Sequence, residues 1–128
     1  MRKKGASVGL GAIPDSEPLS NHIDQTGITY GPDKLEVFRK ACRLRGVGGR
    51  AGKRALVKIF DPCGYWTWFV MSWNPRTDEC SGLVHGAEKE FGSFSLRELS
   101  SVRGPLGIGL EVDTWFLPQE PDASANLR

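Results

Sequence analysis

The chain has 128 residues, of which 39% are apolar and 25% charged, and its formal net charge is +2. These values are typical of one ordinary globular domain with its own core, and no run approaches the roughly 18 apolar residues of a membrane-spanning helix. The three cysteines, Cys42, Cys63 and Cys80, are odd in number, widely spaced and not in CxxC pairs. They argue against a disulfide framework and indicate a reducing cytosol.

Residues 1–31 are predicted to form a disordered leader ahead of a single domain that spans residues 32–118. Gly, Pro, Ser and Asp interrupt this stretch too often for a packed element. Its basic start and the apolar stretch ending at Ile13 weakly resemble a signal peptide. However, glycines interrupt the apolar stretch and no cleavage pattern follows, so we do not expect secretion.

The domain is predicted to open with a helix at Asp33, which has the spacing of a capping box with Glu36. The apolar residues that follow recur at helical spacing, at Leu35, Phe38 and Cys42. A Gly- and Arg-rich connection over residues 44–54 then separates this helix from the sheet, and we expect it to be mobile.

The first strand is predicted at residues 55–60, and an aromatic strand follows at residues 65–73 after the turn 61–64. Alternation divides the aromatic strand between two apolar faces, so we expect it to be central and covered on both sides. One face carries Trp66, Trp68 and Val70, and the other carries Tyr65, Phe69, Met71 and Trp73.

Two further strands are predicted at residues 80–84 and 90–94, and the short loops between the strands favour antiparallel pairing. Ser95 and Glu98 then have the spacing of a capping box for a short helix that ends before Gly104-Pro105.

A last strand is predicted at residues 110–116, followed by a polar tail at residues 119–128. The predicted fold class is therefore α+β. It consists of a small antiparallel sheet of about five strands, an N-terminal helix and one short helix before the last strand.

A run of motifs over about residues 55–118 resembles a known bacterial family. The motifs are Phe60-Asp61-Pro62, Trp66-Thr67-Trp68, Gly92 to Leu99, Val102 to Gly107, Glu111-Val112-Asp113 and Phe116-Leu117-Pro118. In this order they are similar to the family labelled domain of unknown function 2958, and the segment from Phe94 to Gly107 is the most specific part.

The resemblance implies a small α+β fold, a bacterial cytoplasm and a mobile genetic element, such as a plasmid or a phage, as the setting. It supplies no activity, no cofactor and no catalytic residues. Small proteins of mobile elements often counter host defence or regulate plasmid transfer, which is an analogy by context.

Charge is divided unevenly along the chain, with a net charge of +6 over residues 1–54 and −4 over residues 55–128. Five cations lie close together in the sequence with no acidic residue among them: Arg43, Arg45, Arg50, Lys53 and Arg54. We call residues 43–54 the basic arm. It is a candidate for contacts with nucleic-acid phosphates, and the alternative is a solvated loop. Its glycines lack the spacing and the following hydroxyl residue of a phosphate loop.

Aromatic side chains on the sheets of other proteins stack on nucleic-acid bases, and this chain offers four candidates for such stacking: Tyr65, Trp66, Trp68 and Trp73. A strand that is apolar on both faces instead favours a core position for them.

His85, Cys80, Glu88 and Glu90 offer metal-binding atom types without the spacing of a metal site. We therefore predict no metal and no cofactor, and interpret His85 as a loop histidine.

Glu98, Arg103, Glu111 and Asp113 are the candidate site residues inside the domain. Glu111 and Asp113 alternate on one predicted strand, so both point to the same face, where they could perform acid–base chemistry or bind a cation. The alternative is structural: Arg103 bridges one of the carboxylates and fixes the turn that follows it.

Three functions are consistent with these features. The first is a non-enzymatic accessory or inhibitor protein of a mobile element that binds a host protein, favoured by the small size and the acidic body. The second is a nucleic-acid-binding accessory protein that uses the basic arm. The third is a small enzyme with a carboxylate site at Glu111 and Asp113. The sequence leaves the partner and the oligomeric state open and predicts no association with a membrane.

Overall fold

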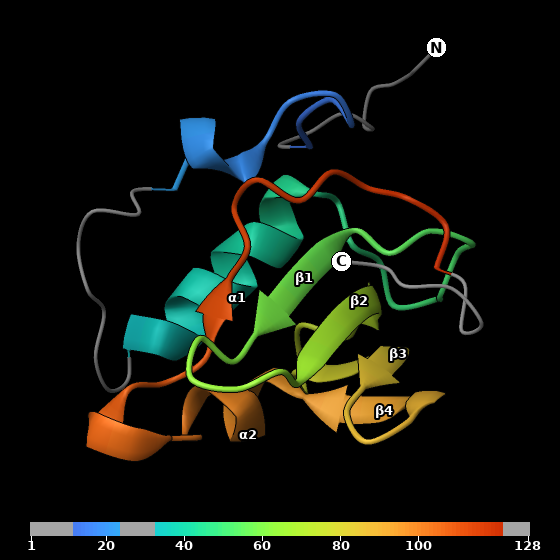
Figure 1. The fold of residues 1–128 in the computed structure, drawn as a ribbon. Coiled ribbons are helices and arrows are strands. Elements are labelled where there is room, and N and C mark those ends of the chain that lie inside the picture. The colour runs from blue at the N-terminus through green and yellow to red at the C-terminus, as the bar shows by residue number, and fades with distance from the viewer. Residues whose placement is uncertain (1–11, 24–32, 122–128) are drawn as a thin grey trace, which may run out of the picture.

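The computed structural model describes residues 12–23 and 33–121, and it has the predicted α+β fold class. Five antiparallel strands form one sheet in the order β4-β3-β2-β1-β5, and two helices and two short 3-10 turns accompany it (Figure 1). The elements in chain order are η1 Leu19–Asn21, α1 Asp33–Leu44, β1 Val57–Phe60, β2 Thr67–Trp73, β3 Glu79–His85, β4 Lys89–Ser95, α2 Leu96–Ser100, η2 Pro105–Gly107 and β5 Glu111–Val112. None of the helices in these two ranges is long and apolar enough to cross a membrane.

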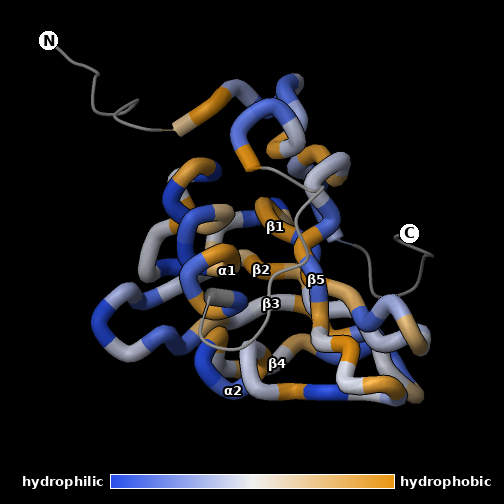
Figure 2. Tube along the Cα trace, turned by 90° about the vertical axis from the view of Figure 1, so that its left-hand side faces the viewer, coloured by the Kyte–Doolittle hydropathy of each residue, from blue (hydrophilic) through white to orange (hydrophobic). Residues whose placement is uncertain are grey.

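The main core lies between the two helices and one face of the sheet. Phe38 and Cys42 of α1 are fully buried there, as the predicted helical stripe requires, and Leu96 of α2 joins them. Val57 and Val70 complete this layer from β1 and β2. Figure 2 shows that the central strands carry much of the hydrophobic sequence, whereas the outlying loops are mostly hydrophilic.

A second, smaller core covers the other face of the sheet. Phe69 and Leu83 are fully buried there, and the ring of Phe116 lies 5.7 Å from that of Phe69 between centroids. The prediction that the aromatic strand is central and covered on both sides is therefore confirmed.

A β-bulge corrects the predicted faces of β2. The register with β3 shifts between Val70 and Ser72, so Trp73 is placed in the main core with Val70 instead of with Phe69. Gly82 permits this close pairing, because a Cβ at that position would lie 1.8 Å from the carbonyl oxygen of Phe69.

Residues 12–23 overturn the prediction of a disordered leader over this part of the chain. Leu19 is 1% exposed and Ile23 is 7% exposed, and both belong to the main core. The backbone of Ile13 also donates to the carbonyl of Leu44, at 2.8 Å. Residues 1–11 and 24–31 of the predicted leader lie outside the described residues, as does the side chain of Asp33 in the predicted capping box.

The Ser95 cap is confirmed: its hydroxyl accepts hydrogen bonds from the backbone N–H groups of Arg97 and Glu98, at 3.1 and 3.3 Å. The predicted last strand is too long, since β5 has only two residues. The chain turns at Asp113, whose carboxylate accepts from the Trp115 N–H and whose carbonyl accepts from the Phe116 N–H.

Candidate functional site

The basic arm does not form one solvent-exposed patch. Arg45 is buried at 6% exposure, and its guanidinium donates to the carbonyls of Pro14 and Phe116, at 3.0 and 3.3 Å. Burial lowers the pKa of Arg45, and the nearby charges of Asp15 and Glu17 oppose this change. Arg45 is therefore a structural link between distant segments, which corrects its assignment to a binding arm.

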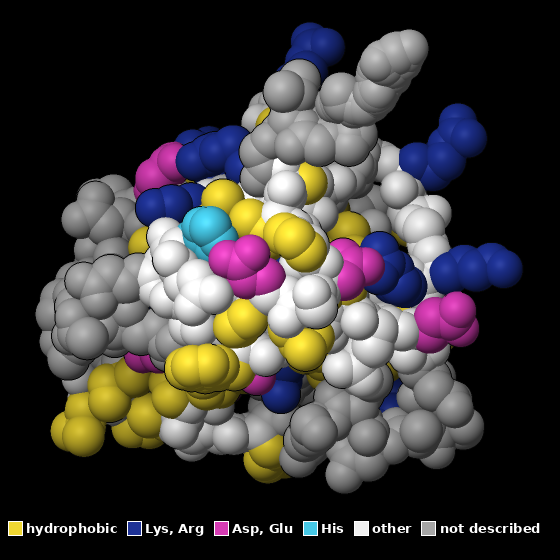
Figure 3. Space-filling view, turned by 90° about the horizontal axis from the view of Figure 1, so that it is seen from above, with side chains coloured by type: hydrophobic (Ala, Val, Ile, Leu, Met, Phe, Trp, Pro, Cys, Tyr) yellow, Lys and Arg dark blue, Asp and Glu magenta, His cyan; other side chains and the backbone are white. Residues whose placement is uncertain are grey.

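Two other cations of the arm have acidic partners from elsewhere in the sequence. Arg43 forms an ion pair with Glu36 at 2.5 Å, and Arg54 pairs with Asp15. Figure 3, which views the molecule from above, shows Lys and Arg side chains scattered around the margin, with acidic side chains beside several of them.

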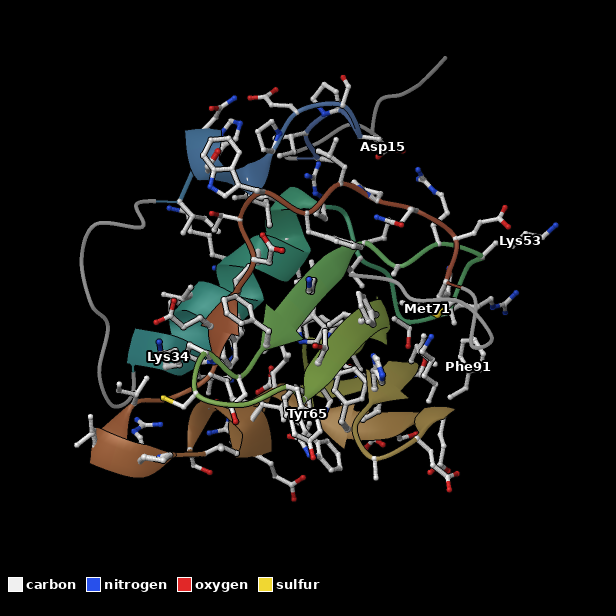
Figure 4. All side chains as sticks on the ribbon, viewed as in Figure 1. Asp15, Lys34, Lys53, Tyr65, Met71 and Phe91 are labelled. Carbon is white, nitrogen blue, oxygen red and sulfur yellow. The ribbon has the colours of Figure 1, made fainter. Side chains whose placement is uncertain are left out.

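Arg50 and Lys53 are exposed, and Lys53 projects away from the body of the protein (Figure 4). The arm is also less mobile than expected at its start, because Val47 is buried and the Trp73 N–H donates to the Gly48 carbonyl at 2.7 Å. A continuous strip of five phosphate-binding cations is therefore absent from this arm.

The predicted carboxylate site is divided by the fold. Asp113 forms an ion pair with Lys58 at 3.5 Å, on the strand beside it. Arg103 instead donates to the carbonyls of Ser100 and Val102, at 2.9 and 2.7 Å, so the predicted bridge from Arg103 to a carboxylate is wrong. Its actual role is to hold the last turn of α2 against the segment that follows.

The other two candidate residues of the domain, Glu98 and Glu111, are exposed. Glu111 acts electrostatically on Lys34 at the start of α1: burial lowers the pKa of Lys34, and the charge of Glu111 opposes that change. Glu111 and Asp113 thus interact with different cations, and no common site brings both carboxylates to one substrate position in the described residues.

Asp78 is the buried polar residue that the sequence did not reveal. It is 1% exposed and adopts a positive φ of 65° in the turn between β2 and β3. Arg39 of α1 donates to both carboxylate oxygens, at 3.0 and 2.6 Å, and Trp73 Nε1 donates at 3.3 Å. Arg97 of α2 approaches to 3.4 Å.

The hydrogen bonds from Arg39 hold the pKa of Asp78 below its ordinary value, although burial opposes this effect. One carboxylate therefore joins both helices to the sheet. Its sequence position, in a turn rich in polar residues, gave no sign of this role, since its arginine partners lie 39 and 19 residues away.

The aromatic residues of the predicted second strand have different environments. Trp73 is 4% exposed and Trp68 packs against the main core, so the core interpretation holds for both. It is wrong for Tyr65 and Trp66, which are 65% and 43% exposed. Figure 4 labels Tyr65 at the turn before β2. These two residues precede the first paired residue of β2, and the adjacent turn is the signal that could have identified them.

Trp66 is held in a defined position. Its ring centroid lies 5.9 Å from that of Trp68, and its six-membered ring lies against Gly86. A Cβ at Gly86 would approach the indole to 2.5 Å, so only glycine fits beneath it. The exposed indole is therefore preorganised by the loop between β3 and β4.

A hollow of about 440 Å³ opens beside Trp66. Its lining combines apolar and acidic residues, namely Trp66, Val84, Ala87, Glu88, Glu90, Phe91 and Gly92. Phe91 is 58% exposed, and both glutamates are exposed as well. We call this hollow and its lining the Trp66 surface.

A smaller hollow of about 220 Å³ also has Trp66 in its lining. Tyr65, Trp66 and the Lys58–Asp113 ion pair line it, together with neighbouring residues of the β1–β2 turn. Of the predicted candidate site residues, Asp113 lines the smaller of these two hollows, and none belongs to the lining of the larger one.

The described residues contain no group of three His, Cys, Asp or Glu side chains that could hold a metal ion. Cys80 is buried, and burial raises the pKa of its thiol to about 12, so it stays protonated. Glu88 and Glu90 line the Trp66 surface, away from this thiol in the main core.

The chain belongs to the family described as protein of unknown function (DUF2958), whose model matches residues 33–124. The match is longer than the motifs indicated, because it also includes α1 and the basic arm. No curated protein and no solved structure matches the chain.

Proposed function

We propose that this protein is a non-enzymatic accessory or inhibitor protein that acts by binding another protein through the Trp66 surface. The observation that carries the proposal is the hollow of about 440 Å³ beside the exposed indole of Trp66, which Gly86 and Trp68 hold in a defined position. Rigid, exposed aromatic side chains beside a hollow are the usual anchors of protein interfaces.

The charge of the surface supports a protein partner with a cationic side chain. Glu88 and Glu90 line the same hollow as the indole of Trp66. A lysine or arginine side chain placed there would lie over an aromatic face and close to a carboxylate, which are two favourable interactions for a cation.

The same carboxylates disfavour nucleic acid at this surface, because they would repel phosphates. Binding of nucleic acid through the basic arm is also less favoured, since Arg45 is buried and two other cations have acidic partners. An enzymatic function at Glu111 and Asp113 is less favoured because the two carboxylates face different cations.

The family resemblance adds a setting to the proposal. On this basis we propose a bacterial cytoplasm as the location, a plasmid or a phage as the encoding element and a host protein as the target. Interference with a host defence protein is one form that such binding takes in this setting.

The test is capture of a partner from a bacterial lysate by the full chain and by matched variants. We expect wild type and Trp115→Ala to retain a stoichiometric partner, because Trp115 is 67% exposed but lines neither hollow. Trp66→Ala, and Glu88→Gln combined with Glu90→Gln, should each reduce capture at least about tenfold. Equal capture by all four proteins would contradict the proposal.

A further inference from the structure

The outer edge of β4 carries backbone groups that face away from the sheet. In an antiparallel pair, residues whose N–H and C=O groups face the partner strand alternate with residues whose groups face away. The Leu96 N–H donates to the Asp78 carbonyl and the Gly86 N–H donates to the Glu88 carbonyl, at 2.9 and 3.0 Å.

Together with the register between β3 and β4, these bonds fix the direction of every backbone group in β4. The even-numbered residues of the strand face β3. Lys89, Phe91 and Ser93 therefore direct their N–H and C=O groups outward, and no residue of the described ranges pairs with this edge.

The edge has few of the features that normally prevent strand addition. β4 has seven residues, it contains no proline, and its pairing with β3 runs without a register shift. The four residues from Glu90 to Ser93 are all exposed. An incoming chain could therefore approach the backbone of Phe91 and Ser93 directly.

The open edge and the Trp66 surface meet along β4. The backbone groups of Phe91 face outward, and its neighbours Glu90 and Gly92 line the hollow. Side chains of directly paired residues share a face of the sheet, so a residue of an added strand paired beside Glu90 or Gly92 would direct its side chain toward the hollow. Backbone pairing and side-chain recognition would thus act on one ligand.

We propose that the partner binds as an extended segment that adds a sixth strand to the outer edge of β4 and places one lysine or arginine side chain in the hollow. The inference rests on the proposed function and specifies the partner's chemistry. Hydrogen bonds to Lys89, Phe91 and Ser93 supply affinity independent of sequence, and the hollow supplies specificity through Glu88 and Glu90.

A second copy of the chain is a poorer occupant. Its β4 would bring its own Glu88 and Glu90 to the junction, so like charges would gather where the two edges meet. A partner segment with a cation at this position has the complementary charge.

The test uses the full chain and displayed random linear peptides of about 12 residues, long enough to pair along β4. We expect selected peptides to alternate β-branched residues with polar residues and to share one lysine or arginine at a fixed position. Ser93→Pro should weaken their binding at least about tenfold, because it removes an outward N–H and leaves the pairing with β3 intact. Ser93→Thr keeps that N–H and should bind as wild type does.

The variants separate this inference from the proposed function. If Trp66→Ala abolishes peptide binding while Ser93→Pro does not, the surface binds proteins but strand addition is wrong. If neither variant changes binding, the Trp66 surface itself is wrong. Selected peptides without a shared cation, or binding unchanged in Glu88→Gln combined with Glu90→Gln, would overturn the role of the hollow.

Hydrogen exchange of the free full chain completes the test. The N–H groups of Phe91 and Ser93 should exchange as fast as those of exposed loops. Slow exchange would overturn the proposal, because the edge would then already be occupied by another part of the chain or by a second copy.

Discussion

The C-terminal part of the chain pairs with one edge of the sheet, at β1, and leaves the other edge, at β4, unpaired in the described residues. At the β1 edge, β5 pairs with Ile59 and Phe60, the Asp113 N–H donates to the Lys58 carbonyl at 2.8 Å, and Ala55 exchanges two hydrogen bonds with Gln119. At the β4 edge, no residue in the described part of the chain takes up the outward groups.

The difference shows that edge protection and core formation are coupled in this fold. The segment that closes the β1 edge also delivers Phe116 to the second core, where it packs on Phe69. The strands at the β4 edge are anchored from the core side, where Asp78 binds Arg39 of α1 and Arg97 of α2. The outward backbone groups of β4 therefore remain available without being needed to anchor the strand.

The largest expected effect comes from Phe116→Ala, which removes the ring that the closing segment buries. We expect the free energy of unfolding to fall by about 3 kcal/mol, because the site keeps a cavity against Phe69. Urea denaturation measures this change. Trp115→Ala is the matched control, since Trp115 is 67% exposed, and a similar loss in both variants would contradict the role assigned to Phe116.

Asp78→Asn tests what anchors the β4 side, and we expect a loss of about 2–3 kcal/mol from the weakened bonds to Arg39 and Trp73. Asparagine tolerates the positive φ of this position, so the change isolates the charge. Urea denaturation at pH 7 measures the loss.

The same variant has a pH dependence with a definite sign. The pKa of Asp78 is lower in the folded protein than its ordinary value, chiefly because Arg39 donates to it. The carboxylate therefore stabilises the fold above the ordinary carboxyl pKa of about 4, and this stabilisation is lost as the pH falls through the folded pKa. The stability difference between wild type and Asp78→Asn should shrink on acidification, and a gap that stays constant would contradict the mechanism.

A pair of proline substitutions compares the two edges directly. Gln119→Pro removes a donor to the Ala55 carbonyl and should destabilise the fold by about 1 kcal/mol. Ser93→Pro removes a donor that faces away from β3 and should change the free energy of unfolding by less than about 0.5 kcal/mol. Thermal unfolding of both variants measures the contrast, and a larger effect at Ser93 would show that the β4 edge is already paired.

The smallest effect on stability is expected for Phe91→Ser. Phe91 is 58% exposed on β4, so the free energy of unfolding should change by no more than about 0.5 kcal/mol. Urea denaturation checks this value. Because the outward backbone groups of residue 91 stay in place, binding should persist in this variant, and a larger loss of stability would contradict the exposure of the Phe91 side chain.

The extent to which the sequence predicted this structure depends on how local each interaction is. The Ser95 cap joins residues two and three positions apart, and the α1 stripe follows from helical periodicity, so both were predicted. The face of Trp73 and the exposure of Trp66 were not, since a bulge decides the first and the strand start at Thr67 decides the second.

The candidate site shows the same division. Arg103 was expected to pair with a carboxylate near it in the sequence, but in the fold its nearest acceptors are carbonyls of the preceding helix turn. The hollow beside Trp66 combines this residue, just before β2, with residues of β3, β4 and the loop between them. No pattern of spacing along the sequence predicts that these residues lie together.

The sequence by itself determined the elements, their antiparallel order and the fold class, because alternation, helical periodicity and capping are short-range effects. Only the tertiary structure decided that Arg45 is buried, that Asp78 joins both helices to the sheet, and that residues 12–23 pack into the core. The physical reason is that burial and ion pairing depend on which distant segments meet, and this also determines which sheet edge the chain covers and which it leaves open.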